Sequence, residues 1–315
     1  MKLHTLIARY VAFRKSLGER FHTNERILES FSRALGSRVE IDDVRADQVS
    51  AFLAGRGPLT SSWHVKHNAL LGFYRYALSR GYAQHSPLPV TIPKRPQPFV
   101  PYIYTRKELH QLLASTLTYQ KHRGRFDPFV VRMMLLFLYG TGLRLGEALA
   151  LTLADLDLAQ TLVTVRESKF FKTRLVPLGP QLAKASLRYL MRRKEVGYSQ
   201  DGSSPFFPGR TGKPINRNTF ENIFRRIRQQ AGIHRAGGER CQPRIHDLRH
   251  TFAVHRLVAW YQEGVEVQRW LPQLSVYLGH AHLAATSTYL SMTPDLLAQA
   301  SERFEQHALK GGAHD

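Results

Sequence analysis

A dense run of prolines constrains the fold of this chain more than any other sequence feature. Prolines stand at positions 87, 89, 93, 96, 98 and 101. Because proline has no backbone N–H and a fixed φ angle, a run of this density forms neither a helix nor a central strand. We therefore expect a semi-extended linker over residues 91–103, between a first domain over residues 1–90 and a second over residues 104–315. A chain of 315 residues is long enough for two domains.

The first domain carries the residue spacing of amphipathic helices. Apolar residues recur at helical intervals over residues 3–18, 26–35 and 63–80. Gly36 and the Gly-Arg-Gly-Pro run at 55–58 interrupt this pattern. Lysines and arginines lie between the apolar positions. The pattern predicts a compact helical domain with basic faces, which suits a DNA-binding domain and a plain helical bundle equally well.

The second domain combines helices with a short β-type pattern. Thr105 is a good N-cap for a helix beginning at Arg106. A helix starting at Pro128 is apolar nearly all round, which predicts that it is buried. The segments 162–165 and 175–178 are rich in valine and leucine and indicate two short strands. The expected fold class is therefore α+β, mainly α with a small antiparallel β-sheet.

The charge of the chain indicates a polyanionic partner. Lys and Arg number 45 against 24 Asp and Glu, a net charge of +21. Nucleic acid ranks ahead of an anionic membrane as that partner, and a merely solubilising basic surface is the alternative. Cys241 is the single cysteine, which excludes an intramolecular disulfide and a multi-cysteine zinc site. The sequence has neither a secretory leader pattern nor a run of about 18 apolar residues, so we expect a cytoplasmic protein without membrane contact.

Chemistry-bearing residues gather in the carboxyl-terminal third. His246 and Arg249 are three residues apart, so on a helix they lie on one face. An imidazole beside a guanidinium is a poor core pair but a good anion site, because the guanidinium fork matches two phosphate oxygens. His280 and Tyr289 follow and add a second imidazole and a phenol. A phenol has an ordinary pKa of about 10, so it serves as a nucleophile only where cations and a base prepare it.

The chain resembles the tyrosine recombinases of the phage integrase family in the order of these residues. The order is His-x-x-Arg from His246 to Arg249, then Leu-Gly-His ending at His280, then Tyr289. The run Thr-Gly-Leu-Arg ending at Arg144, with Glu147 after it, is similar to the first arginine motif of that family. The resemblance identifies Arg144 as a second catalytic arginine, which Glu147 can orient.

The family carries a further catalytic residue, a lysine in a β-hairpin. Lys169 matches its position, with Lys172, Arg174 and Pro177 at the expected offsets. Serine and phenylalanine stand on either side of Lys169 where the family commonly has glycine. Lys172 therefore remains an alternative to Lys169.

The resemblance implies a transesterification without a high-energy cofactor. Tyr289 would attack a DNA phosphodiester and form a 3′-phosphotyrosyl link, while Arg144 and Arg249 clamp the non-bridging oxygens. Lys169 would protonate the leaving 5′-oxygen. His246 would accept the tyrosine proton or bind the phosphate, and His280 would bind a phosphate oxygen. We expect neither a cofactor nor a required metal, because cations rather than carboxylates dominate these motifs.

The resemblance also implies partners and an architecture. The first domain would be a core-binding (SAM-like) domain that clasps double-stranded DNA. A homo-tetramer, or a hetero-tetramer with partner recombinases, would assemble on paired DNA sites. The protein would be associated with the nucleoid. The interval from His246 to His280 is longer than in compact members and looks like that of the transposon-associated branch, which serves mobile elements. A terminal helix from about Thr293 would dock either on a neighbouring subunit or on its own domain.

Two other functions fit parts of the pattern. One is a nicking–closing activity of the type IB topoisomerase kind, which uses a similar set of residues. The other is a non-catalytic DNA-binding protein on the same fold. The position of Tyr289 near the end of the chain and the complete set of six residues favour the recombinase.

Overall fold

The computed structural model describes residues 1–36, 38–96, 100–119, 126–166, 173–280 and 282–291, together with residues 298 and 301. The chain divides into two compact units, Met1–Pro98 and Phe99–Asp315, and each is considered by itself. Every helix within the described ranges is too short or too polar to cross a membrane.

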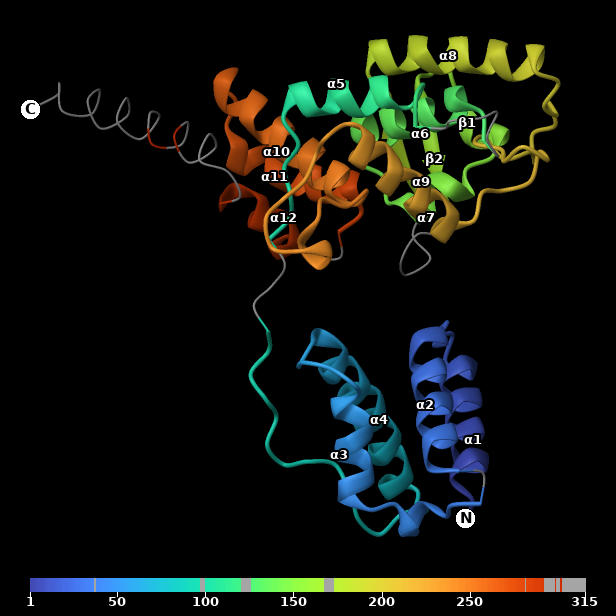
Figure 1. Cartoon of the computed structure of the whole chain (residues 1–315), viewed down its shortest axis with the longest axis vertical. Coiled ribbons are helices and arrows are strands. Elements are labelled where there is room, and N and C mark those ends of the chain that lie inside the picture. Colours follow the sequence, from blue (N-terminus) through green and yellow to red (C-terminus); the bar gives the residue numbers. More distant parts are fainter. Residues whose placement is uncertain are drawn as a thin grey trace, which may run out of the picture. The chain divides into compact units, whose positions relative to one another are not determined.

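Helices are the main secondary structure among the described residues of the first unit, which also has one isolated β-bridge between Lys2 and Glu40. Its elements are α1 (Leu3–Ser16), α2 (His22–Leu35), a 3-10 turn (Ile41–Asp43), α3 (Ala46–Ala54) and α4 (Ser61–Ser79). Helix α4 packs against the other three, and all four are seen in blue to teal in Figure 1. Their apolar faces meet in one core around Leu28, Phe31, Leu70 and Phe73. The predicted helical character of this region is confirmed.

The second unit contains the remaining helices and the sheet. Its helices are α5 (Arg106–Ser115), α6 (Pro128–Thr141), α7 (Leu145–Ala150), α8 (Pro180–Glu195), α9 (Arg217–Gln230), α10 (Asp247–Gln262), α11 (Val267–Leu278) and α12 (Ala284–Ser287). Its 3-10 turns are η2 (Leu153–Asp155), η4 (Glu239–Cys241) and η5 (Thr288–Ser291). Its strands are β1 (Leu156–Asp157), β2 (Leu162–Val165) and β3 (Arg174–Pro177).

Helix α6 is the central element of the second unit. Asp127 caps it by accepting a hydrogen bond from the backbone N–H of Phe129 at 2.9 Å, and Pro128 occupies its first position. It packs against α8 on one side and α10 on another (Figure 1). The prediction of a buried helix is confirmed. Gly142 ends the helix at φ +62°, a left-handed conformation that favours glycine.

The three strands form an antiparallel sheet in the order β1–β2–β3. Val163, Val165 and Val176 alternate with more exposed neighbours and point into the core. The two predicted strands are therefore confirmed, and together with the helices they confirm the α+β fold class. Strand β1 was not predicted, because two residues are too few to show an alternation. Register pairs Arg174 with Val165, so the arginine begins β3 at the end of the ladder.

The second unit buries its apolar side chains in two clusters that meet on α10. Leu248 belongs to the cluster around α6 and the sheet, whereas Phe252, one turn later, belongs to the cluster of α10, α11 and η5. Arg249 lies between these two residues along the helix and is itself buried. The fold therefore places a guanidinium where the two clusters adjoin, and the candidate site is built around it.

Candidate active site

Arg249 is held rigidly by backbone carbonyls. Its side chain is 2% exposed, Nη1 donates to the carbonyl of Gly142 at 2.7 Å, and Nη2 donates to the carbonyl of Leu278 at 2.6 Å. Burial, reinforced by the charge of Arg144, lowers the pKa of Arg249 to about 10. The guanidinium is still a cation at neutral pH. The carbonyls that orient it come from the ends of α6 and α11, so three helices fix one charged group.

Arg144 and Arg174 share one carboxylate. The backbone N–H and Nη1 of Arg144 donate to Glu147 Oε2 and Oε1 at 2.9 and 2.8 Å. Arg174, on β3, donates from Nη1 to Glu147 Oε1 at 3.1 Å and from Nη2 to Oε2 at 2.9 Å. The remaining contacts run to α11 and the residue after it: Arg144 Nη2 donates to the Gly279 carbonyl at 2.9 Å, and Arg174 Nε to the Tyr277 carbonyl at 2.9 Å. Glu147 thus contacts Arg144, as its predicted orienting role requires, and Arg174 is an additional partner of the same carboxylate.

The Glu147 carboxylate is the anion that allows these cations to lie together. Burial alone would raise the pKa of Glu147, but the hydrogen bonds and charges of Arg174 and Arg144 outweigh it and lower the pKa to about 2. The side chain is 8% exposed, so its ion pairs are shielded from solvent. Glu147 therefore carries a full negative charge throughout the neutral pH range.

The two predicted histidines are neutral at pH 7. Burial and the charge of Arg249 lower the pKa of His246 and of His280 to about 4. His246 directly precedes α10, and His280 follows α11 with its Nδ1 at 2.7 Å from Thr286 Oγ1. A neutral imidazole presents one N–H donor and one lone-pair nitrogen. Each ring can therefore give one hydrogen bond to an anion and accept another.

Tyr289 lies in η5 with its ring turned into this group of residues. It is 2% exposed, and its ring centroid is 6.1 Å from that of His280. Its Oη is 3.1 Å from Nδ1 of His250. Burial raises the pKa of Tyr289, although the charges of Arg249 and Arg144 oppose the rise. The phenol is therefore protonated at neutral pH, and to act as the predicted nucleophile it would need an acceptor for its proton.

The structure gathers most of the predicted set into one site. Contacts through the end of α11 join Arg144, Arg249 and His280, and Tyr289 and His246 adjoin the same guanidinium groups. The predicted Lys169 and its alternative, Lys172, lie outside the described residues, between β2 and β3.

Two contributors were missed by the sequence reasoning. Arg174 stands at the family's expected offset after Lys169 but was given no role. His250 directly follows Arg249 and lies one helical turn after His246, a spacing that places two imidazoles on one helix face.

A basic pocket of about 550 Å³ opens beside His246. Its walls include the side chains of Arg217, Arg225 and Arg244. Guanidinium groups of this kind suit an anionic backbone. The described residues hold no group of three or more His, Cys, Asp or Glu side chains arranged to bind a metal ion.

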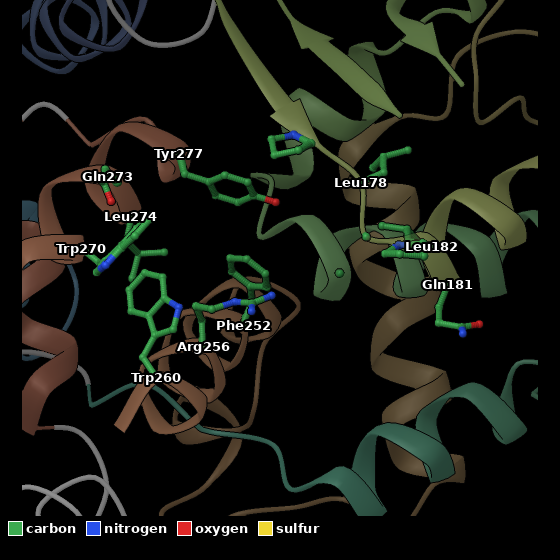
Figure 2. Close-up of a pocket in the computed structure, with 14 residues that line it drawn as sticks. Leu178, Gln181, Leu182, Phe252, Arg256, Trp260, Trp270, Gln273, Leu274 and Tyr277 are labelled. Atoms are coloured by element: carbon green, nitrogen blue, oxygen red, sulfur yellow. The ribbon is translucent and has the colours of Figure 1, made fainter. Parts of the chain in front are cut away.

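A second pocket, of about 590 Å³, is apolar and contains none of the six predicted residues. Trp260 and Trp270 lie on one wall with ring centroids 6.2 Å apart, and Leu178 and Leu182 lie across the opening from them (Figure 2). The long interval between His246 and His280 supplies both tryptophans. This pocket lacks the clustered cations of the candidate site.

Comparison with known proteins gives the same family, the phage integrases, that the sequence motifs resemble. Residues 104–295 match the model of the phage integrase family. A putative integrase/recombinase y4rB of Sinorhizobium fredii is 31% identical over 306 residues, which are 95% of this chain and 96% of that protein. The tyrosine recombinase XerC of Azotobacter vinelandii is 33% identical over 271 residues, 85% of this chain and 82% of its own length.

Solved structures share the fold at lower identity. The Tn1549 transposon integrase in complex with a circular intermediate DNA superimposes with a TM-score of 0.69 at 17% identity, covering 96% of this chain and 99% of that one. A lambda integrase dimer bound to a COC′ core site gives 0.67 at 17% identity, covering 93% and 97%. With the family model spanning most of the second unit and near-complete relatives above 30% identity, the chain belongs to the phage integrase family and is a tyrosine recombinase, an enzyme of site-specific DNA breakage and rejoining.

Proposed function

We propose that Tyr289 is the nucleophile of this recombinase. Its Oη attacks the phosphorus of a DNA phosphodiester, forms a 3′-phosphotyrosyl link and releases a 5′-hydroxyl. The observation that carries the proposal is a buried, protonated phenol beside the cations of Arg249 and Arg144 and in hydrogen-bond contact with an imidazole. The covalent link conserves the energy of the phosphodiester, so a 5′-hydroxyl of another strand can reverse the step without ATP.

The two arginines stabilise the charge that develops on the non-bridging oxygens. Arg249 and Arg144 are both fixed by carbonyls at the end of α11, which supports a clamp that needs little rearrangement when phosphate arrives. We expect replacement of either arginine by alanine to lower the cleavage rate by about 10²–10³-fold, by analogy with the removal of oxyanion-hole donors.

Two histidines, a lysine and a third arginine have the remaining proposed roles. His280 and His246 are neutral, so each can donate an N–H to a phosphate oxygen. Lys169 protonates the leaving 5′-oxygen, with Lys172 as the alternative donor. Arg174 is a positioning residue, because it acts through Glu147 on Arg144.

The substrate is double-stranded DNA. The net charge of +21 and the basic pocket with Arg217, Arg225 and Arg244 support binding along the phosphate backbone. The helical first unit serves as the core-binding domain that holds the duplex, and a tetramer of this chain, alone or with partner recombinases, assembles on paired sites. The long His246–His280 interval favours a recombinase that acts on mobile-element DNA. The DNA substrate favours a location in the cytoplasm, at the nucleoid.

A strand-exchange assay tests the proposal. Purified protein is incubated, in EDTA, with a supercoiled plasmid and labelled linear duplexes tiled across the DNA that flanks its own coding sequence. Recombinant joints at one defined sequence, together with protein–DNA complexes that survive denaturation, are the expected result, and both vanish in Tyr289→Phe. Sequence-independent relaxation of the plasmid without strand exchange would instead indicate a topoisomerase-like enzyme. DNA binding without either product, also on nicked substrates that trap cleavage, would contradict the proposal.

A further inference from the structure

The phenol of Tyr289 has a partner that none of the six predicted residues provides. His250 Nδ1 is 3.1 Å from Tyr289 Oη, and the two ring centroids are 5.6 Å apart. His250 lies in α10 directly after Arg249, whose guanidinium is fixed by two backbone carbonyls. The same helix therefore supplies the imidazole that contacts the phenol and a cation beside it.

The imidazole can accept this hydrogen bond because its surroundings keep the ring neutral. Burial, then the neighbouring cations and rings, lowers the pKa of His250 to about 3, so the ring is neutral at pH 7. The groups that face it from the surrounding elements are His246, Arg249, Arg244, His280 and Tyr289. A neutral imidazole protonated at Nε2 has its lone pair on Nδ1, and a protonated phenol has one hydrogen to give. In this tautomer, Tyr289 Oη–H donates to His250 Nδ1.

We propose that His250 is a catalytic residue, whose Nδ1 holds the hydroxyl of Tyr289 in place and takes its proton as Oη attacks phosphorus. This inference rests on the proposed function, since it requires Tyr289 to be the nucleophile. It assigns the acceptor role to a residue other than His246, which the resemblance suggested. His246 lies with its ring centroid 4.9 Å from that of His250, and it remains available for the phosphate.

The step balances without any further reactant. A bond forms between Oη and phosphorus, the bond from phosphorus to the 5′-oxygen breaks, and its electron pair leaves with that oxygen. The phenolic proton moves to His250, and the proposed acid, Lys169, protonates the 5′-oxygen. In the resealing step a 5′-hydroxyl attacks phosphorus and gives its proton back to Lys169. The bond from phosphorus to Oη breaks, and His250 returns its proton to the departing phenolate. A bound phosphodiester favours the imidazolium, because its negative charge offsets the cations that lower the pKa of His250 in the free protein.

A second imidazole–phenol pair on the same helix provides a matched control. His255 Nδ1 is 3.0 Å from Tyr139 Oη, with ring centroids 5.9 Å apart. Both histidines lie on α10 and are partly buried. Tyr139 is on α6 and is not a candidate nucleophile. Replacing either histidine by asparagine therefore removes an equivalent basic imidazole from the fold, and only one of the two imidazoles contacts the proposed reacting oxygen.

The experiment is single-turnover cleavage of a duplex that carries the site found in the strand-exchange assay. A second duplex has sulfur in place of the bridging 5′-oxygen, which leaves as a thiolate and needs no proton. Wild type, His250→Asn, His250→Ala, His255→Asn and Lys169→Ala are compared, with thermal melting and gel-shift binding measured for each.

We expect His250→Asn and His250→Ala to slow adduct formation about 100-fold on both duplexes, because general-base catalysis contributes about 10²–10⁴-fold. Lys169→Ala should recover on the sulfur duplex, and His255→Asn should cleave like the wild type. The His250 variants should also speed up as pH rises from 6 to 9, because hydroxide must then remove the phenolic proton, whereas the wild-type rate changes less.

Three results would overturn the inference. They are that His250→Asn, still folded and DNA-bound, cleaves within threefold of wild type, recovers fully on the sulfur duplex, or follows the wild-type pH profile. Each result would assign the proton to another acceptor while leaving Tyr289 as the nucleophile. A wild-type enzyme that forms no adduct on Tyr289 would refute the proposed function and this inference together.

Discussion

Removing the charge of Glu147 should destabilise the second unit more than any other single-atom change in the site. In Glu147→Gln, one oxygen of a carboxylate that binds two arginines becomes an amide nitrogen. Arg144 and Arg174 are then left close together without the anion between them. The side chain is 8% exposed, so water replaces little of the lost interaction.

Two routes give the same magnitude. A fall in the pKa of Glu147 from 4.5 to about 2 corresponds to about 3 kcal/mol at about 1.36 kcal/mol per pH unit. Breaking a buried ion pair by removing one partner costs about 3–5 kcal/mol. The pKa is depressed in the folded state, so this stability is fully present above pH 4.5 and is lost as pH falls toward 2. We therefore expect a loss of about 3 kcal/mol at pH 7 and about 2 kcal/mol at pH 3.5.

Urea unfolding followed by tryptophan fluorescence measures this loss. In a Trp63→Phe background the remaining tryptophans, Trp260 and Trp270, both lie in the second unit, so the signal reports on that unit. Glu221→Gln is the control. Its carboxylate pairs with Arg217 at 2.9 Å but is 39% exposed, and we expect its loss to cost less than about 0.5 kcal/mol. A loss below about 1 kcal/mol in Glu147→Gln, or an equal loss at pH 7 and pH 3.5, would refute the reasoning.

Three further predictions concern the backbone, protonation and DNA binding. Gly142→Ala should lower the free energy of unfolding by about 2–3 kcal/mol and reduce cleavage, because its φ is +62° and its Cβ would stand 2.6 Å from Phe252 Cδ1. Urea unfolding checks this, with Gly146→Ala in α7 as a control that should be no less stable than the wild type. Lowering the pH from 6.5 toward 4 should destabilise the protein. In the folded state His246 and His280 have pKa values of about 4 and stay unprotonated over this range, whereas in the unfolded state both become protonated. A pH series of melting temperatures that stays flat over this range would contradict the prediction. Raising salt from 50 to 200 mM should weaken duplex binding by about 10³-fold if about six phosphates are neutralised, and titrations with less than tenfold change would argue against backbone binding.

Much of the fold was readable from the sequence because its local signals were strong. The helix α6 is apolar nearly all round and begins at Pro128, so its existence and burial followed from the local residue pattern. The strands β2 and β3 showed clear valine and leucine patterns, whereas β1 is only Leu156–Asp157 and has no pattern to read. The family motifs indicated Arg144, Arg249 and Tyr289 by residue order, before any contact was known.

The contacts that organise the site could not be read in this way, because they join distant parts of the chain. Arg174 reaches Glu147 only because the sheet carries it to the start of α7. The carbonyl of Gly142 receives a hydrogen bond from Arg249, and carbonyls have no sequence signature. His250 has no distinguishing sequence signal, and its role depends on η5, which places Tyr289 within hydrogen-bond distance of it. Tertiary packing, rather than local propensity, decides these pairings.

The central claim is that Tyr289 forms the covalent bond to DNA, and peptide mass spectrometry tests it most directly. Complexes from the strand-exchange assay are denatured, digested with nuclease and protease, and the modified peptide is sequenced. The account predicts nucleotides attached to Tyr289 through a 3′-phosphate. An adduct on another tyrosine, or a link through a 5′-phosphate, would contradict it.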